Sequence, residues 1–560
     1  MRLESLENAV VWARMRALGW THWRPFVRAA REPKRTQERL LQGLLYRNRD
    51  TAFGREHNFR VIAGYDDFVA AVPVQTYESL RPYVERQQQT GEPALTVAPP
   101  VLYAQTSGTT GQPKLIPLLE ETLAGYKRTQ ATQSYALFCA EPEVFYGRIL
   151  GIVSPAVEGR LASGAPYGSA SGHVYQTMPR RARERYVLPE EVLTIEDYEL
   201  KYEVIVSLAL RCPDISCIAT ANPSTLLRLV AVFREHRETL LRDIAAGTLS
   251  CSDRLTPAQR AAILPRLECP RERIAELHSL LKVPNPSVAD IWPRLRLIST
   301  WTGGSCAIAL DAVRRALPPA VRVAELGYMS SEFRGTIAVS MDTSSGAPTI
   351  EQNFFEFVEC DAWDSGRPRF STVEDLQDGA RYYIVVTTSG GLYRYFMNDI
   401  VEVSGRFHNT PCIRFVQKGT GVTNITGEKL HESQVIEAVQ SAEKELGRAS
   451  VFFVMLADAQ QSRYRLFIEW PDAAPRQVDS LRDAVERELY AQNIEYAQKR
   501  ESGRLQRLEA ATLGAATGHA YKRHYVERGQ REIQFKIVAL QPADSCSFPF
   551  ADFTVDMRDG

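Results

Sequence analysis

The sequence lacks several features that would assign it to common protein classes. No Cys-x-x-Cys pair occurs among its nine cysteines, so neither a zinc-site pattern nor a disulfide framework is indicated. No stretch approaches the roughly 18 uninterrupted apolar residues of a membrane-spanning helix. Lys plus Arg and Asp plus Glu both number 67, which gives a formal net charge of zero. Without a basic arm, binding to nucleic acid or to an anionic membrane surface is not expected.

Other absences narrow the function further. The sequence contains neither a Walker loop nor a Gly-x-Gly-x-x-Gly segment after a strand, which excludes a P-loop kinase. No Ser-His-Asp or Cys-His set is evident, and there is no internal repeat or low-complexity tract. The N-terminal residues 1–7 lack the basic-then-apolar order of a signal peptide. We therefore expect a cytoplasmic protein whose cysteines are mostly small buried apolar residues.

The residues that are present predict an α/β protein. The 560 residues are 44% hydrophobic, which is enough to bury large cores. Helical spacing of apolar residues predicts helices over 4–48, with a break at Pro33, and over 68–72 and 77–86. From there to about 418, strand-like runs alternate with helical ones, as in an α/β fold with buried sheets. The strand candidates are 149–153, 204–208, 295–299, 383–387 and 413–416, and the helix candidates are 225–246 and 307–317.

The C-terminal region has a different pattern. An amphipathic helix over 428–446 precedes strands at 451–455 and 464–468, and helices are predicted at 477–491 and 517–528. A segment of about 140 residues is long enough for an independent domain. Gly419 and Gly421 give the join torsional freedom. We expect an N-terminal domain over 1–418 and a mobile C-terminal domain over 419–560, with a hinge at about 418–424.

The most informative segment is Thr106-Ser-Gly-Thr-Thr-Gly-Gln-Pro-Lys114, which comes directly after the apolar run Val101–Ala104. Its glycines allow close approach of the backbone, and successive amide groups form an anion-binding nest. Its hydroxyls and its lysine add hydrogen-bond donors and a positive charge. The segment therefore predicts a phosphate-binding loop, the alternative being a surface turn rich in small residues.

Two further segments carry groups suited to a nucleotide. In Leu326–Glu332, an aromatic ring, two hydroxyls and a carboxylate come one after another, and Glu332 is a candidate ligand because Mg²⁺ prefers hard oxygen donors. In Gly391–Asp399, the aspartate can accept hydrogen bonds from a ribose diol and Arg394 can offer a fork to phosphate. An exposed glutamate and a strand edge with an adjoining turn are the alternatives.

Two segments near the expected hinge and the C-terminus are less specific. Val422–Glu432 has residues typical of a helix N-terminus, without a capping box at Thr426 and Lys429. Gln534-Phe-Lys536 places a lysine close to the end of the chain, where most lysines are simply solvated.

In order and spacing these segments resemble the acyl acid amido synthetases, the Gretchen Hagen family of auxin-responsive proteins and its bacterial relatives. That family is a branch of the adenylate-forming ligases. Its three signatures match Thr106–Lys114, Tyr328–Glu332 and Tyr393–Asp399. Other ligases of the superfamily show Tyr-Gly-x-Thr-Glu, so the Ser-Ser-Glu of this chain points to the amido synthetase branch.

The resemblance implies a large ligase-like domain of β-sheets flanked by helices and a small α+β domain that moves. It also assigns roles. The residues expected to bind the nucleotide are Thr106, Ser107, Gly108, Thr109, Thr110, Gly303, Gly304, Tyr328, Met329, Ser330, Ser331, Arg394, Asp399, Phe415 and Lys429. The residues expected to act in catalysis are Lys114, Glu332, which would also hold Mg²⁺, and Lys536. The residues expected to contact the acid are Arg128, Thr220, Asn222 and Thr302.

Three positions depart from the family pattern. Asn398 stands where many members have glycine, and Phe396 where plant members often have arginine. Ile-Val comes after Lys536 where a proline is expected nearby.

The implied reaction has two steps. A substrate carboxylate first attacks the α-phosphorus of ATP and displaces pyrophosphate, which requires positioning and charge neutralisation rather than a protein nucleophile. An amine, expected to come from an amino acid, then attacks the acyl-adenylate and displaces AMP. The alternatives are a ligase that uses coenzyme A or a carrier protein as acceptor and a non-catalytic nucleotide-binding protein. We expect a monomer or weak dimer, and neither the acid nor the amine is fixed by the sequence.

Overall fold

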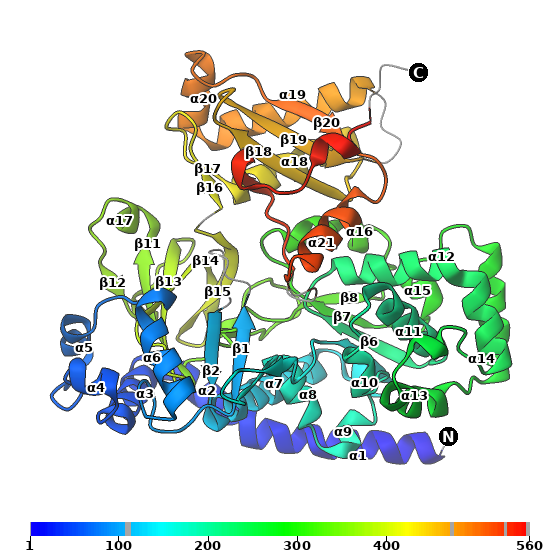
Figure 1. The fold of residues 1–560 in the computed structure, drawn as a ribbon, viewed down its shortest axis with the longest axis horizontal. Helices are drawn as coiled ribbons and strands as arrows, with labels where there is room; N and C mark the ends of the chain where they lie inside the picture. Colours follow the sequence, from blue (N-terminus) through cyan, green and yellow to red (C-terminus); the bar gives the residue numbers. More distant parts are fainter. Residues whose placement is uncertain are drawn as a thin grey trace.

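The computed structural model describes residues 2–106, 114–419, 421–470, 475–530, 532 and 535–555. A broad lower body is formed by the chain up to the end of strand β15 (Thr410–Lys418), and a smaller upper body is formed by most of the chain beyond that strand (Figure 1). We call these the N-terminal part and the C-terminal part. Both combine helices with sheets, which confirms the predicted α/β class.

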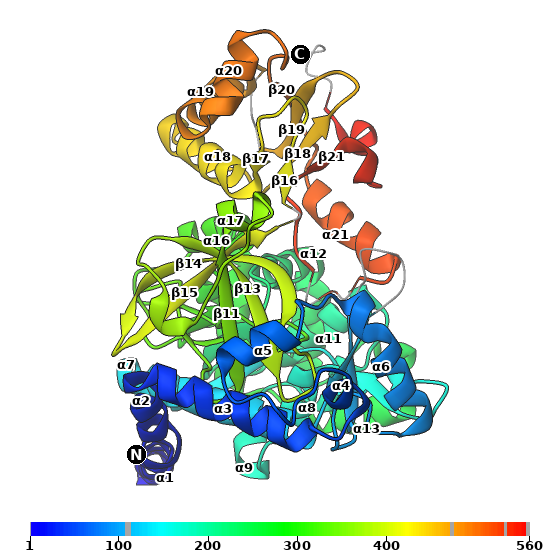
Figure 2. The ribbon, with the colours of Figure 1, turned by 90° about the vertical axis from the view of Figure 1, so that its left-hand side faces the viewer.

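The first helices wrap one side of the N-terminal part (Figure 2). Pro33 is the first residue of a helix, a position where its missing N–H is not needed, and the expected break therefore falls directly before it. These elements are α1 (Arg2–Leu18), a π-helical turn (Gly19–Trp23), α2 (Arg24–Arg31), α3 (Pro33–Asn48), α4 (Ala52–Glu56), α5 (Tyr65–Ala71) and α6 (Tyr77–Thr90).

A parallel four-stranded sheet forms the centre of one half of the N-terminal part. Its order is β3 (Arg148–Ile152), β6 (Ile215–Thr220), β7 (Leu297–Thr300) and β8 (Arg322–Glu325). Helices α11 (Tyr198–Leu210), α12 (Ser224–Ala246) and α16 (Cys306–Arg315) lie among its connections. Parallel strands end at one edge of the sheet, so the segments that begin at Ala221, Trp301 and Leu326 leave from the same side.

The predicted strand at 204–208 is wrong, because this run lies inside helix α11. Almost the whole helix is buried, so its apolar residues do not alternate with polar ones. A short apolar run does not distinguish a buried strand from a buried helix. The N-cap identifies the segment as a helix, since the Asp197 carboxylate accepts a hydrogen bond from the Leu200 amide at 3.0 Å.

Two other sheets of four or more strands lie in the N-terminal part. The first is mixed, in the order β2 (Lys114–Leu118), β1 (Leu102–Thr106), β5 (Pro166–Gly168) and β4 (Gly159–Arg160). The second is antiparallel, in the order β12 (Phe370–Ser371), β11 (Asn353–Glu359), β13 (Arg381–Thr388), β14 (Tyr395–Phe407) and β15. In the second sheet Asp399 pairs with Lys418, and Val401 pairs with Phe415.

The remaining elements of this part connect or cover the sheets. They are α7 (Glu120–Ala140), α8 (Ala170–Gln176), α9 (Arg180–Arg183), α10 (Glu190–Leu193), α13 (Pro257–Ile263), α14 (Arg271–Ser279), α15 (Val288–Ile291), α17 (Cys360–Asp364), β9 (Thr336–Ile337) and β10 (Ala347–Pro348). Short 3-10 turns lie at Pro142–Phe145, Ser252–Arg254, Leu264–Arg266, Leu280–Lys282 and Val373–Asp375.

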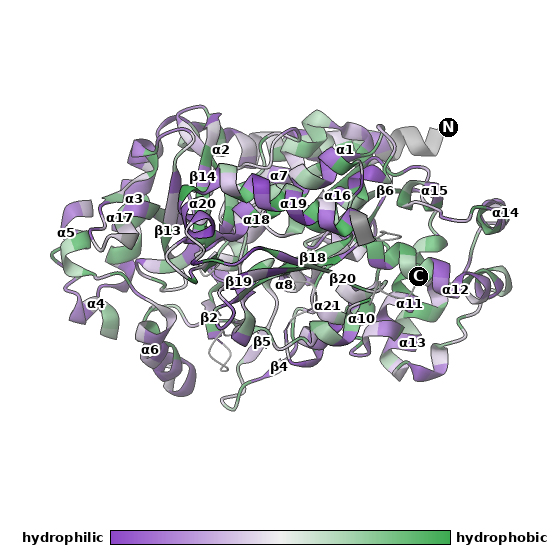
Figure 3. Cartoon of the chain, turned by 90° about the horizontal axis from the view of Figure 1, so that it is seen from above, coloured by the Kyte–Doolittle hydropathy of each residue, from purple (hydrophilic) through white to green (hydrophobic). Residues whose placement is uncertain are grey.

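The C-terminal part is a four-stranded sheet packed against helices. Its main sheet has the order β20 (Glu509–Thr512), β19 (Arg463–Glu469), β18 (Phe452–Asp458) and β21 (Leu540–Pro542). The other elements are β16 (Val422–Thr423), β17 (Leu430–His431), α18 (Glu432–Leu446), α19 (Pro475–Gln492), α20 (Ile494–Glu501), α21 (Thr517–Glu527) and 3-10 turns at Ala543–Ser545 and Phe550–Phe553. Seen from above, α18 and α19 carry both hydrophilic and hydrophobic residues, as amphipathic helices do (Figure 3).

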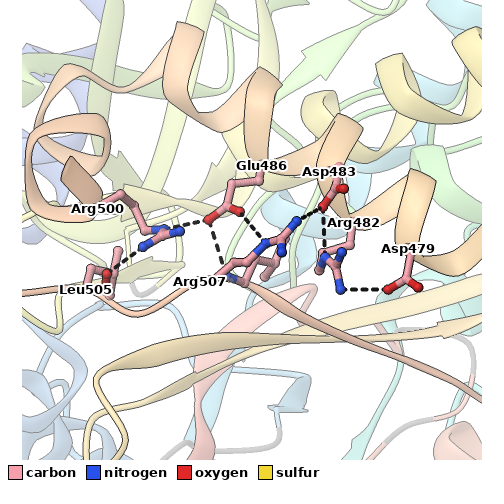
Figure 4. A network of polar contacts seen from close by, with 8 residues as sticks. Asp479, Arg482, Asp483, Glu486, Arg500, Leu505 and Arg507 are labelled. Carbon is pink, nitrogen blue, oxygen red and sulfur yellow. Dashed lines mark hydrogen bonds and ion pairs between the residues drawn. The ribbon is translucent and has the colours of Figure 1, made fainter. Parts of the chain in front are cut away.

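A network of ion pairs fixes the outer helices of the C-terminal part (Figure 4). Glu486 of α19 accepts from Arg500 of α20 at 2.5 Å, and Arg500 also donates to the carbonyl of Leu505 at 2.8 Å. Arg507 reaches Asp483 at 2.5 Å. Because Glu486 and Arg500 are largely buried, their pairing connects α19, α20 and the segment before β20 more firmly than an exposed ion pair would.

Two features of the whole chain bear on its class. Within the described ranges, no helix combines the length and the apolar character needed to cross a lipid bilayer. Five of the nine cysteines are buried, as expected: Cys212, Cys217, Cys251, Cys306 and Cys412.

Candidate active site

A cavity of about 570 Å³ lies where the central parallel sheet, strand β15 and the C-terminal part meet. It gathers residues that lie far apart in the sequence. Those among the expected site residues that line it are Lys114, Thr220, Tyr328, Met329, Ser330, Ser331, Glu332, Asp399, Phe415 and Lys536. The tyrosine, glutamate, aspartate and lysine segments therefore converge, as the sequence motifs predict for a single ligand.

At one side of the cavity, Tyr328 and Asp399 form a buried pair. The Tyr328 hydroxyl donates to Asp399 Oδ2 at 2.7 Å, and burial together with this carboxylate raises the pKa of Tyr328 well above its ordinary value. The Tyr328 ring stacks on Phe415 with centroids 5.9 Å apart. Asp399 Oδ1 is buried without a hydrogen-bond partner. A buried acceptor of this kind is costly unless a donor reaches it, so the site suits a ligand hydroxyl.

Lys418 is a site residue that the motifs did not reveal. Its ammonium group lies 3.6 Å from Asp399 Oδ1, and this carboxylate is the main reason why the pKa of Lys418 is raised. The antiparallel pairing of β14 and β15 places the two residues opposite each other. The register of these strands, which is not visible in the sequence, brings the charge to the cavity.

Lys536 comes from the C-terminal part and enters the cavity between two aromatic rings. Its ammonium group lies 4.6 Å from the centroid of Trp301 and 4.6 Å from that of Phe415. Cation–π contacts hold a lysine without neutralising its charge. The lysine is thus positioned as a positive group in the wall of the cavity.

Gly303 and Gly304 lie beside Phe415. A Cβ at Gly303 would come within 2.7 Å of the Phe415 carbonyl oxygen, and one at Gly304 within 2.8 Å of its ring. Gly304 also has φ +58, a conformation that favours glycine. The two glycines are absent from the described lining of the cavity, so their observed effect is to let β15 approach closely.

Lys114 and Glu332 supply opposite charges to the cavity. Lys114 begins β2 and pairs in register with Thr106 at the end of β1, so the predicted phosphate loop connects two antiparallel strands. Ser107, Gly108, Thr109 and Thr110 lie outside the described residues, as does the Thr106 side chain. No cluster of three or more His, Cys, Asp or Glu side chains suited to a metal occurs in the described part of the chain. One carboxylate beside substrate phosphates fits Mg²⁺, which is often held in this way.

Arg394 does not reach the cavity lining, contrary to expectation. Its guanidinium lies in the core and pairs with Glu356 at 2.9 Å, and it also donates to the Val72 carbonyl at 2.7 Å. Through these contacts the side chain holds the five-stranded sheet against α5. The prediction of a phosphate contact by Arg394 is therefore not retained.

Three more expected site residues lie outside the cavity lining. Arg128 is exposed on α7, and Lys429 is exposed between β16 and β17. Thr302 is turned toward Glu325, whose carboxylate accepts from both its amide, at 2.9 Å, and its hydroxyl. Helix phase and strand direction, which a motif does not specify, explain these differences.

Asn222, expected to contact the acid, holds the lysine segment instead. Its Nδ2 donates to the Phe535 carbonyl at 2.5 Å, and its Oδ1 accepts from the Ser224 amide at 2.9 Å. It is absent from the described lining of the cavity. Asn222 thus connects the end of β6 to the residue before Lys536.

Replacing Asn222 with alanine is expected to lower the maximal rate of the Lys536-dependent step by about fivefold, because one hydrogen bond of about 1 kcal/mol then no longer positions the lysine. The KM for the acid should stay unchanged. Steady-state kinetics with varied acid concentration measures both. A raised KM with an unchanged maximal rate would instead assign Asn222 to acid binding.

Two further residues that line the cavity, Glu432 and Arg334, were not expected from the sequence motifs. Glu432 begins α18 and accepts from the Ala539 amide at 2.5 Å; burial raises its pKa to about 7. Arg334 lies two residues after Glu332, and its guanidinium donates to Gln130 Oε1 at 3.3 Å. The two-residue spacing from Glu332 could have suggested that Arg334 faces the same side of an extended segment.

Comparison with solved structures identifies the fold class. The structure titled AtGH3.15 acyl acid amido synthetase in complex with 2,4-DB is 20% identical, has a TM-score of 0.82 and covers 95% of this chain and 96% of its own. A 2-hydroxyisobutyryl-CoA ligase in the postadenylation state with 2-HIB-AMP is 12% identical, with a TM-score of 0.53 over 90% and 88% of the two chains. The fold is that of the adenylate-forming ligases.

Family models assign the chain more closely. It matches the GH3 family N-terminal domain over residues 23–320, the GH3 family central domain over 346–418 and the GH3 family C-terminal domain over 433–543. The chain belongs to the GH3 family, which confirms the resemblance drawn from its motifs.

Curated relatives are amide-forming ligases by name. Indole-3-acetic acid-amido synthetase GH3.2 of Arabidopsis thaliana is 25% identical over 469 residues, which are 79% of this chain and 84% of that protein. Jasmonoyl--L-amino acid synthetase JAR4 of Nicotiana attenuata is 23% identical over 525 residues, which are 89% of this chain and 90% of that protein.

Proposed function

We propose that this protein is an ATP-dependent ligase that activates a carboxylic acid as its adenylate and transfers the acyl group to an amine, forming an amide. The observation that carries the proposal is the cavity that joins Lys114, Tyr328, Glu332 and Asp399 of the N-terminal part with Lys536 of the C-terminal part. Membership of the GH3 family and the names of its curated relatives support the same reaction.

In the first step, an oxygen of the acid attacks the α-phosphorus of ATP while the bond to pyrophosphate breaks. Asp399 accepts from the ribose through Oδ1, which has no hydrogen-bond partner in the protein, and Tyr328 and Phe415 provide flat faces for adenine. Lys114 and the loop before it bind phosphate oxygens. Glu332 would hold Mg²⁺, which would offset the charge of the phosphates when bound.

Lys536 supplies the positive charge that would stabilise the transition state of this step. Negative charge accumulates on the acid and the α-phosphate as their oxygens approach, and a fixed cation lowers the barrier most when it is already in place. The two flanking rings and the Asn222 bond to Phe535 hold it there. We therefore assign the described conformation to the adenylation step.

In the second step, the neutral amine attacks the acyl carbon, its proton leaves and AMP departs. We propose that the C-terminal part, which carries Lys536 into the cavity, rotates about residues 418–424 between steps. Strand β15 ends at Lys418 and β16 begins at Val422, with Gly419 and Gly421 nearby. Such a hinge would also bring the exposed Lys429 to a new position.

Coenzyme A is the main alternative acceptor, since the 2-hydroxyisobutyryl-CoA ligase shares the fold. We favour an amine because the motifs and the family models both belong to the GH3 branch.

The proposal is tested with the full-length protein, ATP, Mg²⁺ and a panel of carboxylic acids. We expect ATP–pyrophosphate exchange with at least one acid and faster AMP release when amino acids are added. Faster AMP release with coenzyme A, but not with amino acids, would contradict the amide-forming reaction. No exchange with any acid, by a protein that binds ATP in a separate titration, would contradict the ligase itself.

A further inference from the structure

Besides its lysines, the cavity lining contains the guanidinium of Arg334. Helix α7 contributes Tyr126 and Gln130 to the lining. Tyr186 also lines the cavity, and its ring makes a T-shaped contact with Tyr175 at a centroid distance of 5.1 Å. Arg334 lies among them. Around this group the lining is apolar, with contributions from Leu137, Val144, Phe145, Ile149, Val174 and Leu297.

The guanidinium of Arg334 has no carboxylate partner within 4.0 Å among the described residues. Its one described side-chain hydrogen bond is the 3.3 Å contact with Gln130. A guanidinium has five N–H donors, and a partly buried cation without an anionic partner keeps part of its desolvation cost. Burial accordingly lowers the pKa of Arg334.

Two hydroxyls of the cavity also lack hydrogen-bond partners. The Tyr126 hydroxyl is buried without a hydrogen-bond partner, and the same holds for the hydroxyl of Thr220, which lines the same cavity. The amide of Gln133 is used elsewhere, since its Nε2 donates to the carbonyls of Glu325 and Leu326 at 3.2 Å. Ligand oxygens at this place would satisfy both the cation and the hydroxyls.

Arg334 and Lys536 act at different places. Burial raises the pKa of Tyr126 and Tyr186, and in both cases the charge of Arg334 opposes the rise. Lys536 instead opposes the effect of burial on the pKa of Glu432. Their contacts differ in the same way, since Lys536 lies between Trp301 and Phe415 whereas the Arg334 guanidinium donates to Gln130 of α7.

We propose that the acid substrate has an apolar, ring-sized body and carries a second anionic group, which binds Arg334 while the first carboxylate reacts near Lys536. This inference rests on the proposed ligase activity and names its substrate class. Arg334 also takes the place of Arg128, the exposed arginine that was expected to contact the acid.

The test compares matched acids in ATP–pyrophosphate exchange: benzoate with isophthalate, and phenylacetate with homophthalate. The monoamide of each diacid replaces the second carboxylate by a neutral group of similar shape. We expect kcat/KM to be highest for a diacid and about 50-fold lower for its monoamide, as charge-assisted hydrogen bonds to a partly buried guanidinium predict. In Arg334→Met the diacid-to-monoamide ratio should fall to about one, and Arg334→Lys should restore part of it.

Arg128→Met is the control, because that arginine is exposed on the same helix that lines the cavity, and its ratio should equal that of the wild type. An equal loss with every acid in Arg334→Met, without a change in ratio, would place Arg334 at the reacting atoms and overturn the inference. A wild-type preference for monoacids would also overturn it. No exchange with any acid would instead contradict the proposed ligase activity, and melting temperatures identify a variant that fails to fold.

Discussion

Lys536→Met is expected to slow ATP–pyrophosphate exchange by about 100- to 1,000-fold, the loss typical when one preorganised charge-stabilising donor is removed. The reason is geometric, because Lys536 lies between Trp301 and Phe415 and lines the same cavity as Glu332 and Asp399. The methionine keeps most of the volume of the side chain, so the rings stay separated. Rapid-quench or isotope-exchange measurements at saturating ATP determine the rate.

Lys429→Met serves as the matched control, since Lys429 is exposed outside the cavity lining. Its exchange rate should remain within about twofold of the wild type. If domain rotation brings Lys429 to the second step, AMP release to the amine should fall in this variant while exchange does not. Equal exchange rates in Lys536→Met and the wild type would remove Lys536 from the first step.

Glu432→Gln is expected to change how stability depends on pH. Burial raises the pKa of Glu432 to about 7, whereas an exposed glutamate titrates near 4.5. The folded state therefore holds a proton that the unfolded chain has already lost at neutral pH. The stability contributed by Glu432 is complete below about pH 4.5 and is lost as the pH rises through about 7, by at most about 3 kcal/mol.

Urea unfolding at pH 5 and at pH 8.5 measures this effect as the difference between the variant and the wild type. Glutamine can still accept the Ala539 amide but cannot ionise, so the variant should gain about 2.5 kcal/mol relative to the wild type between these two pH values. Glu437→Gln is the control, because Glu437 is exposed on the same helix. A constant difference between variant and wild type would show that Glu432 does not titrate in this range.

The contacts of Glu432 connect its protonation to the proposed domain rotation. Its carboxylate connects the start of α18 to the Ala539 amide, three residues after Lys536. The charges of Lys536 and Lys418 oppose the rise of its pKa. Withdrawal of Lys536 during rotation would therefore favour protonation of Glu432, which connects the position of the catalytic lysine to the hinge.

Most of the fold can be predicted from local patterns in the sequence. The alternation of strands and helices predicted the α/β class, and Pro33 and the apolar runs at 383–387 and 413–416 marked true element boundaries or strands. The failure at 204–208 has a clear cause, since a helix buried on all sides loses the periodicity that identifies helices.

The candidate site, too, could be predicted from the sequence only in part. Tyr328, Glu332, Asp399 and Lys536 carry chemical groups whose order along the chain is a recognisable signature, and the structure brings them to one cavity. Arg394 belongs to the same signature, yet its side chain pairs with Glu356 in the core. A motif specifies which residues are present, but it does not specify which way each side chain points.

The class of reaction could be inferred from the order of residues alone, because the groups that recognise a nucleotide and a carboxylate must occur in a particular order and spacing. The charges that surround the acid could not, since Arg334, Lys418 and Glu432 reach the cavity through strand register and through contact between the two parts of the chain. Such contacts depend on packing between distant segments, and no local pattern of residues encodes them.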